Sequence, residues 1–396
     1  MDQLVELYRR LLSRIDLSFE RSLGSGIRWE HRMIGIMGSR GVGKTTLVLQ
    51  YIKKEFAGRE NRALYVSLDH LWFASNSVLD MADHFSKAGG ELLVLDEVHK
   101  YPNWSQELKN IFDFYPDLKV VFTGSSLLEI LNSRADLSRR ALVYQLSGMS
   151  FREFLQLETG QIFRSVRLEE LLENHESIAS EIIAHLKPLQ YFPEYLRKGY
   201  YPFYRQFEEL YDHQLRSVIN LIVEIELPQL RKFDIAYVSK IKQLLGIISD
   251  SVPFIPNVSK LSEKIGINRT TLLTYFHYLA ESKVTANLYS ENQGISLLQK
   301  PEKLYLENTN LAYALGKNVN EGNIRETFFL NQVSNGHQIN LPQKGDFLVN
   351  RRWLFEVGGK SKPLKGPGEQ DFFVAADGIE LGYQNKIPLW LFGFLY

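Results

Sequence analysis

Residues 38–45 read Gly-Ser-Arg-Gly-Val-Gly-Lys-Thr and lie between two short segments of opposite character. The apolar run 33–37 (MIGIM) is typical of a buried strand, and 44–56 (KTTLVLQYIKKEF) has apolar residues at helical spacing. The glycines therefore fall where a strand turns sharply into a helix. This octet satisfies every fixed position of the phosphate-binding P-loop and predicts an α/β fold whose first strand ends at an anion site.

The residue types of this loop suggest its chemistry. Glycines allow backbone amides to turn inward around an anion, and the helix N-terminus adds partial positive charge. Lys44 is expected to reach the β- and γ-phosphates of ATP, and Thr45 is expected to bind Mg²⁺, with Thr46 as a weaker candidate. The predicted nucleotide-binding residues are Gly38, Ser39, Arg40, Gly41, Val42, Gly43, Lys44, Thr45 and Thr46.

A second element, 91–97 (ELLVLDE), has four consecutive apolar residues followed by two acids. This pattern predicts a buried parallel strand that delivers both acids to the carboxyl edge of a sheet. Asp96 is then expected to hold hydrated Mg²⁺, and Glu97 to orient or deprotonate the attacking water. The alternative is an exposed strand end with two solvated acids.

Two further segments supply candidates for contact with the γ-phosphate. The strand-like run 119–123 ends in Thr-Gly-Ser-Ser, so Thr123, Ser125 or Ser126 is a candidate sensor, with an ordinary turn as the alternative. Arg140 follows Arg139 just before the strand-like run 142–146. It is a candidate to stabilise phosphate charge, within the chain or across a subunit interface, or else a solvated surface arginine.

Composition restricts the class of protein. The 396 residues, 44% of them apolar, predict two to four domains, and the net charge of zero excludes a whole-chain field that would recruit nucleic acid or membrane. The absence of cysteine excludes disulfides and thiolate chemistry and is consistent with a cytoplasmic protein.

The two ends of the chain carry apolar patterns. Residues Leu4, Leu7, Leu11 and Ile15 predict an N-terminal helix that packs on the core. The run 387–396 (IPLWLFGFLY) is about half the length of a membrane span and is predicted to be a buried strand, so no membrane association is expected.

Five segments together resemble a known family: GSRGVGKTTL, LLVLDEVHKYPNW, VVFTGSSLLEI, SRRALVYQLSGMSFREFL and YLRKGYYPF. They are similar to the prokaryotic AAA+-type P-loop ATPases that carry a C-terminal domain of unknown function, with a winged helix and a PD-(D/E)xK nuclease-like domain. In that family the arginine before the fifth strand commonly follows a glycine, whereas here Arg139 precedes Arg140.

The resemblance implies an α/β fold with five parts: an N-terminal helix (1–30), a doubly wound parallel ATPase core (31–150), a helical lid over the nucleotide (151–226), a winged helix-turn-helix (227–299) and a nuclease-like α/β domain (300–396).

The segment 259–283 has the proportions of a helix-turn-helix, with a turn at Gly266 and a second helix capped by Asn268. Polar residues near the start of that second helix are candidates for contact with DNA bases: Arg269, Thr270, Thr271 and Thr274. Basic residues are sparse, and winged helices also dock proteins, so DNA and protein are equal alternatives as partners.

Residues 346–357 predict a β-hairpin with its turn at 350–352. Asp346 then faces Glu356 with Cβ atoms about 5 Å apart, which suits a shared divalent metal for phosphodiester hydrolysis. Glu326 is a candidate third acid, and the alternative is a pair of solvated acids. The family's lysine two residues after the glutamate is replaced by Gly358, so Lys360 or Lys362 either reaches back or the catalytic group is lost.

These patterns predict a protein that binds and hydrolyses ATP with Mg²⁺ and acts as a nucleotide-driven switch or motor on DNA. The alternative is a nucleotide-gated protein-interaction switch whose nuclease-like domain is degenerate. A homo-oligomer is among the expected partners.

Overall fold

The computed structural model describes residues 1–124, 137, 139–231, 235–291, 299–317, 319–364 and 371–396. The chain divides into two compact units, Met1–Gly148 and Met149–Tyr396. The boundary lies close to the predicted end of the ATPase core at residue 150. Each unit has its own five-stranded sheet and its own apolar core.

The sheet of the N-terminal unit is entirely parallel, in the order β2-β3-β4-β1-β5. Its strands are β1 (Met33–Met37), β2 (Ala63–Ser67), β3 (Leu92–Asp96), β4 (Lys119–Gly124) and β5 (Leu142–Gln145). All residues of β1 and β3 are buried, as expected for strands covered on both faces. The α/β prediction is confirmed, and strands are present at the four runs predicted above, 33–37, 91–97, 119–123 and 142–146.

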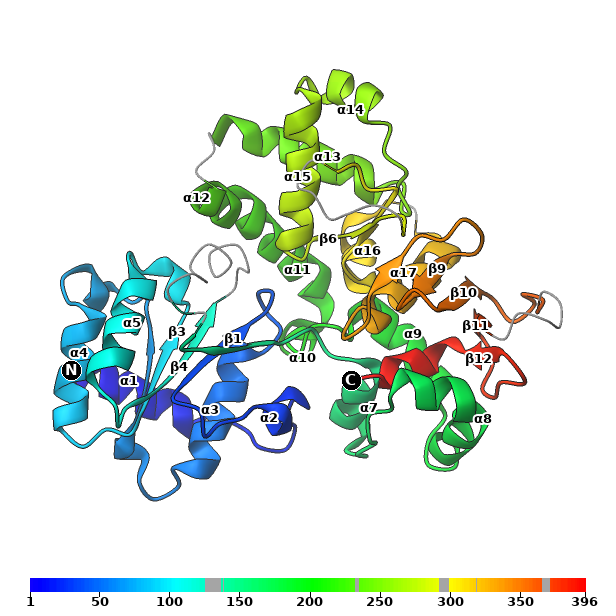
Figure 1. Cartoon of the computed structure of the whole chain (residues 1–396). Coiled ribbons are helices and arrows are strands. Elements are labelled where there is room, and N and C mark those ends of the chain that lie inside the picture. Colours follow the sequence, from blue (N-terminus) through cyan, green and yellow to red (C-terminus); the bar gives the residue numbers. More distant parts are fainter. Residues whose placement is uncertain (125–136, 138, 232–234, 292–298, 318, 365–370) are drawn as a thin grey trace. The chain divides into compact units, whose positions relative to one another are not determined.

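Helices cover both faces of this sheet, with α1 beside α3 and α4 beside α5 (Figure 1). The helices of this unit are α1 (Asp2–Ser13), α2 (Leu23–Gly26), α3 (Lys44–Glu55), α4 (Val78–Lys87) and α5 (Trp104–Phe114). The strand order explains this division. The connection through α3 runs across the sheet in one direction and those through α4 and α5 in the other, so right-handed crossovers lie on opposite faces.

Helix α1 packs on α3 and β2, but with a different face from the predicted one. The buried side chains are Leu4, Tyr8 and Leu12, whereas Leu7 and Leu11 are 37% and 42% exposed. Tyr8 buries its ring and donates its hydroxyl hydrogen to the Glu60 carbonyl at 3.2 Å. The prediction of the helix is confirmed, and its predicted apolar face is wrong by about one residue.

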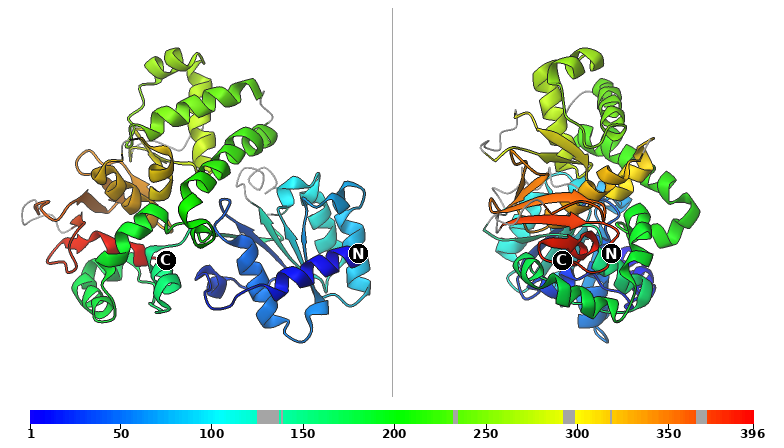
Figure 2. Two further views of the ribbon diagram at one scale, coloured as in Figure 1. Left: turned by 180° about the vertical axis from the view of Figure 1, so that it is seen from behind. Right: turned by 90° about the vertical axis from the view of Figure 1, so that its right-hand side faces the viewer.

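The C-terminal unit contains many short helices before and around its sheet (Figure 2). Its helices are α7 (Phe151–Thr159), α8 (Leu168–Ile183), α9 (Pro188–Lys198), α10 (Tyr204–Phe207), α11 (Tyr211–Leu221), α12 (Leu227–Arg231), α13 (Val238–Ser249), α14 (Val258–Ile265), α15 (Arg269–Glu281), α16 (Thr309–Leu315) and α17 (Glu321–Val333). Its strands are β6 (Thr285–Leu288), β7 (Lys303–Leu306), β8 (Ile339–Asn340), β9 (Phe347–Val349), β10 (Trp353–Gly358), β11 (Phe372–Ala376) and β12 (Lys386–Pro388).

The second sheet is mixed, in the order β12-β11-β10-β9-β8, with β10, β11 and β12 parallel. Helix α17 packs on β10, α8 packs on β12, and α7 and α9 contact the 3₁₀ helix Leu389–Phe394. The helices predicted as a lid therefore belong to the same compact unit as the predicted nuclease-like domain. Their role over a nucleotide stays a prediction.

The predicted helix-turn-helix is formed by α14 and α15. Gly266 ends α14 at φ +72°, a conformation that favours glycine, and the Asn268 side chain accepts the Thr271 amide hydrogen at 2.8 Å. The antiparallel pair β6–β7 follows α15. The turn and the cap are confirmed, and the assignment as a winged helix stays a prediction.

The apolar C-terminal run is buried but is only partly a strand. β12 ends at Pro388, and Leu389–Phe394 then forms a 3₁₀ helix. A short apolar run cannot be assigned to strand or helix by periodicity, which explains the partial error. Across the described residues, no helix combines the length and the apolar character that a membrane span requires.

Candidate functional site

The loop after β1 has the backbone that the glycine pattern predicts. Gly41 and Gly43 have φ of +87° and +96°, the left-handed region in which a Cβ is strained. Gly38 is required by a close approach, because a Cβ there would lie 2.2 Å from the Leu146 carbonyl oxygen. The loop is therefore held against the chain that follows β5, and it leads directly into the first turn of α3.

Lys44 and Thr45 begin α3, and their side chains point to different partners. The Lys44 ammonium is buried and donates to the carbonyl oxygens of Gly38 at 2.9 Å and Ser39 at 3.0 Å. The Thr45 hydroxyl donates to Asp96 Oδ2 at 2.7 Å. Thr46 is exposed, in agreement with its place as the weaker candidate.

Asp96 is the point at which three strands and the loop meet. β4 lies between β1 and β3, and the pairing of Leu95 with Phe122 puts Thr123 next to Asp96. The Thr123 hydroxyl donates to Asp96 Oδ1. The structure thus brings together Thr45, Asp96 and Thr123, as the sequence predicts.

Glu97 follows β3 with φ of +55°, a left-handed conformation that is uncommon for a residue with a side chain. Its amide donates to Asp96 Oδ1 at 3.1 Å. The carboxylate lies 3.4 Å from His99, measured from Oε2 to Nε2. The turn therefore directs Glu97 away from the strand and against the His99 ring.

His99 is almost fully buried, with 3% of its side chain exposed. Burial, together with the positive charges of Lys100, Lys44 and Arg40, lowers the pKa of His99 from 6.5 to about 3. The imidazole is therefore neutral at physiological pH. Its contact with Glu97 is one between a neutral ring and a carboxylate.

The depressed pKa of His99 predicts a loss of stability in acid. Between pH 6.5 and 3 the imidazole is protonated in the unfolded chain but not in the folded protein. The neutral His99 therefore contributes to folding stability above pH 6.5, and this stability is lost as pH falls toward 3. At pH 5 the loss is about 2 kcal/mol. We expect the thermal midpoint of the wild type to fall more steeply between pH 7 and 5 than that of His99→Gln, measured by circular dichroism. Equal slopes would contradict this assignment.

Two residues of the site are absent from the sequence-based prediction. Tyr65 on β2 donates its hydroxyl hydrogen to Asp96 Oδ2 at 2.5 Å. Arg21, also buried, donates to the carbonyl oxygens of Val42, Ser147 and Gly148 and so ties the phosphate loop to the segment after β5. The motif contains neither residue, and only the strand order reveals that β2 borders β3.

Arg140 lies at the opposite edge of the sheet from the phosphate loop. β5 runs parallel to β1, with Ile34 opposite Leu142, so a residue that precedes Leu142 is at the amino ends of the strands. The Arg140 guanidinium donates twice to Asp113, at 2.9 and 3.0 Å. This position does not support contact with a phosphate in the same chain. The predicted contact across a subunit interface remains untested, and Ser125 and Ser126 lie outside the described residues.

The hairpin in the C-terminal unit has the predicted register. The ladder of β9 and β10 ends with Phe347 opposite Phe355, so Asp346 and Glu356 are the next residues along the two chains. Asp346 Oδ2 accepts the Val357 amide hydrogen at 2.8 Å, and Glu356 is buried. Among the described residues, no group of three or more histidine, aspartate or glutamate side chains is arranged to hold a metal. The register therefore places the two predicted acids at the same end of the hairpin, and the described residues form no three-ligand set with Glu326.

Lys362, rather than Lys360, reaches back to the hairpin. Its ammonium lies 3.1 Å from Glu356 Oε2. The Lys362 side chain passes over Gly358, where an added Cβ would be 2.9 Å from Lys362 Cδ. The glycine thus leaves the space that the lysine fills. Nearby, burial raises the pKa of Glu326, and the charge of Asp346 raises it further.

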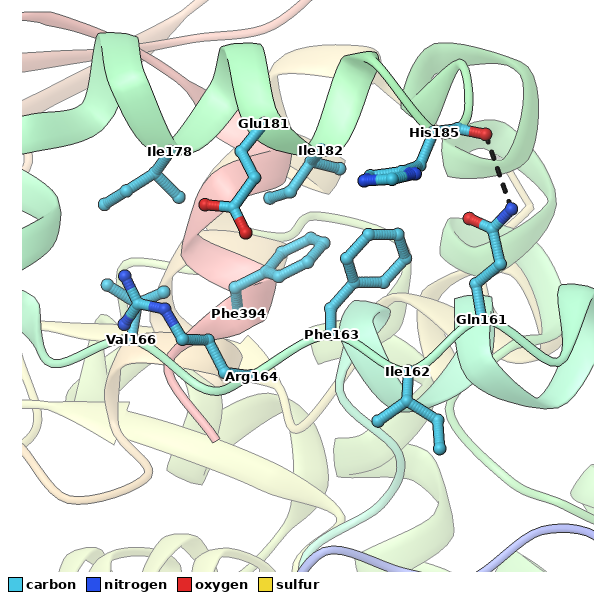
Figure 3. Close-up of a pocket in the computed structure, with 10 residues that line it drawn as sticks. All are labelled: Gln161, Ile162, Phe163, Arg164, Val166, Ile178, Glu181, Ile182, His185 and Phe394. Carbon is cyan, nitrogen blue, oxygen red and sulfur yellow. Dashed lines mark hydrogen bonds between the residues drawn. The ribbon is translucent and has the colours of Figure 1, made fainter.

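A cavity of about 430 Å³ lies elsewhere in the C-terminal unit, between the segment 161–166 and α8 (Figure 3). Phe163 and Phe394 point into it with ring centroids 5.9 Å apart. Arg164, on its lining, is paired with Glu170 at 2.6 Å. The described residues that line this cavity are distant in sequence from every predicted site residue.

Comparison with known proteins supports different conclusions for the two units. Residues 30–155 match the model of a family described as an AAA domain, and residues 189–322 match one described as a domain of unknown function. The second match begins within the predicted lid and ends before the hairpin. It leaves the nuclease-like assignment a prediction.

An uncharacterized protein of Methanocaldococcus jannaschii is 26% identical over 285 residues. The alignment covers 69% of this chain and 60% of that protein, so this chain spans less than two thirds of its relative.

The solved structures that match this chain include the following two. PCH-2 of C. elegans is 18% identical, with 42% of this chain and 48% of that chain covered and a TM-score of 0.26. AMPPCP-bound DnaA from Aquifex aeolicus is 17% identical, with 70% and 87% covered and the same TM-score of 0.26. Scores this low establish no shared overall fold. The family match, the parallel sheet and the glycine loop agree with one another: residues 30–155 resemble a P-loop domain of the AAA type.

Proposed function

We propose that the N-terminal unit binds ATP with Mg²⁺ and hydrolyses it, and that this cycle drives a switch or motor that acts on DNA. The observation that carries the proposal is the surroundings of Asp96. Its carboxylate collects the hydroxyls of Thr45, Tyr65 and Thr123 at the end of a buried strand beside the phosphate loop. Oxygen donors of this kind suit a hard cation such as Mg²⁺.

Each group has a distinct role in the proposed reaction. The loop amides and the N-terminus of α3 bind phosphate, and Lys44 moves from the loop carbonyls to the β- and γ-phosphate oxygens. Thr45 and Asp96 hold the cation, which supplies charge neutralisation at the phosphates when it is bound. Glu97 accepts the proton of the attacking water, and Thr123 lies where it can detect the γ-phosphate. Arg140 of a neighbouring copy stabilises charge at the phosphate, which requires release from Asp113.

ATP turnover by the purified chain tests this proposal. We expect Mg²⁺-dependent phosphate release that falls at least about 100-fold in Lys44→Ala. Lys87→Ala is the matched control, because that lysine is exposed and pairs with Asp83 on α4. Full activity in Lys44→Ala would exclude the loop as the site.

The DNA part of the proposal rests on the start of α15. Arg269 and Thr270 are exposed at its first turn, and Lys260 and Lys264 are exposed on α14. These cations offer phosphate contacts beside a helix whose N-terminus can approach base edges. We expect duplex DNA to raise ATP turnover in a salt-dependent manner and Arg269→Ala to weaken that response.

Arg197→Ala is the control for the DNA experiment, since its side chain is 67% exposed on α9. If DNA neither binds to the protein nor stimulates ATP turnover at low salt, the proposal of a motor that acts on DNA is contradicted. That result would favour the alternative, a nucleotide-gated protein-interaction switch with a degenerate C-terminal domain.

A second candidate activity is metal-dependent phosphodiester hydrolysis at Asp346 and Glu356. The contact between Lys362 and Glu356 favours this activity. It places a lysine ammonium beside the glutamate, although position 358, where the family has its lysine, is a glycine here. We expect nicking of plasmid DNA with Mn²⁺ or Mg²⁺ that is lost in Glu356→Gln and Lys362→Ala and retained in Lys360→Ala. Nicking that survives Glu356→Gln would refute this site, and no nicking by the wild type would favour a degenerate domain.

A further inference from the structure

We infer that Tyr65 is a positioning residue for the Mg²⁺ site: it fixes the Asp96 carboxylate so that the Thr45 hydroxyl presents its free lone pairs to the metal that accompanies the nucleotide. This inference rests on the proposed binding of ATP with Mg²⁺. It assigns a role to a residue outside both motifs of the site. It also predicts a defect that is specific to the metal rather than to the nucleotide.

The sheet register brings Tyr65 to the correct face. Tyr65 pairs with Val94, and Asp96 lies two residues farther along β3, so both side chains project from the same face. The distance to this diagonal neighbour is within the reach of a tyrosine. The hydroxyl ends 2.5 Å from Asp96 Oδ2. The ring itself belongs to the core, with 6% of the residue exposed.

The same carboxylate oxygen accepts from two hydroxyls. Thr45 reaches Asp96 Oδ2 at 2.7 Å, and Tyr65 reaches it at 2.5 Å. A threonine hydroxyl has one hydrogen and two lone pairs, so donation to Asp96 leaves the lone pairs available to a cation. Tyr65 restrains the torsion of the carboxylate that sets this orientation. Thr123 and the Glu97 amide restrain the other oxygen, Oδ1.

Tyr65 is the donor in its contact with Asp96, because a phenol carries a hydrogen and a carboxylate oxygen can only accept. A hydrogen bond to a charged acceptor in a buried site is about twice as strong as one between neutral groups.

The experiment compares Tyr65→Phe with the wild type in the full-length chain, using a fluorescent ATP analogue as the probe. Binding is measured in EDTA and across a Mg²⁺ titration. We expect affinity in EDTA within about twofold of the wild type and a Mg²⁺ midpoint raised about tenfold. Tyr115→Phe is the matched control. Tyr115 also donates its hydroxyl hydrogen to an aspartate, at 3.0 Å, but that aspartate is Asp83 on α4, outside the proposed site.

A double-mutant cycle with Asp96→Asn tests whether Tyr65 acts through Asp96. If it does, adding Tyr65→Phe to Asp96→Asn changes the Mg²⁺ midpoint little, because the group that Tyr65 positions is already altered. Additive shifts would overturn this route. A merely structural role would instead lower the thermal midpoint and leave the Mg²⁺ dependence unchanged.

The outcomes separate this inference from the proposed function. A wild type that binds no nucleotide with or without Mg²⁺ refutes the proposed function. A wild type whose binding tightens with Mg²⁺, together with a Tyr65→Phe variant of identical Mg²⁺ midpoint, refutes the role of Tyr65 alone. Loss of metal-free binding in Tyr65→Phe would mean that Tyr65 supports the whole loop, and the inference would fail equally.

Discussion

Replacing Glu97 by glutamine is expected to lower kcat for ATP by at least about 100-fold while nucleotide affinity stays within a few-fold of the wild type. The amide has nearly the shape of the carboxylate but cannot accept a proton from water. The turn that carries Glu97 is formed by its backbone, with φ of +55° and an amide that donates to Asp96. The substitution therefore removes the base and retains the turn.

Single-turnover phosphate release and binding of a fluorescent ATP analogue measure these two quantities separately. Glu91→Gln is the matched control, because Glu91 lies just before the same strand, β3, and pairs with Arg59 and Arg62 on the surface. A kcat close to that of the wild type in Glu97→Gln would mean that another group activates the water. Weakened binding with unchanged kcat would assign Glu97 to the nucleotide instead.

Gly38→Ala is expected to destabilise the N-terminal unit by about 3 kcal/mol or more and to abolish nucleotide binding. The new Cβ would lie 2.2 Å from the Leu146 carbonyl oxygen and 3.1 Å from Val42 Cγ2. The first of these atoms belongs to the backbone next to β5 and cannot rotate away, so β5 or the loop must move. For a unit of this size the expected fall in thermal midpoint is roughly 10 °C.

Differential scanning calorimetry of the full chain measures the midpoint. Gly24→Ala is the control, because no atom lies within 4 Å of a Cβ at that position. An unchanged midpoint and intact nucleotide binding in Gly38→Ala would show that the contact between the loop and Leu146 is not rigid.

The sequence predicts the phosphate loop and the acidic strand well, because both depend on local patterns. Glycines at fixed spacing determine the turn, and four apolar residues before Asp96 determine a buried strand. The predicted strand β1 has the bounds that the structure gives it. What local patterns cannot supply is the neighbour of a strand, so the contact of Tyr65 with Asp96 follows only from the pairing of β2 with β3.

Three further placements depend on information that a linear pattern does not contain. The predicted apolar face of α1 omits Tyr8. A tyrosine can be buried there because its ring is apolar and its hydroxyl donates to a backbone carbonyl, that of Glu60. Arg140 follows the P-loop and acidic motifs in sequence but lies at the other edge of the sheet, because β5 runs parallel to β1. Lys362 replaces the lysine expected at position 358 only because the chain bends after β10, which a linear motif does not encode.

The contact of the Lys44 ammonium with the carbonyl oxygens of Gly38 and Ser39 has a kinetic consequence. A buried cation without acceptors would pull water or a counter-ion into the loop, and the entering nucleotide would first have to displace it. Here the chain supplies neutral acceptors of its own. In the proposed reaction, phosphate oxygens would replace these two carbonyls by rotation of one side chain, without rebuilding of the loop backbone.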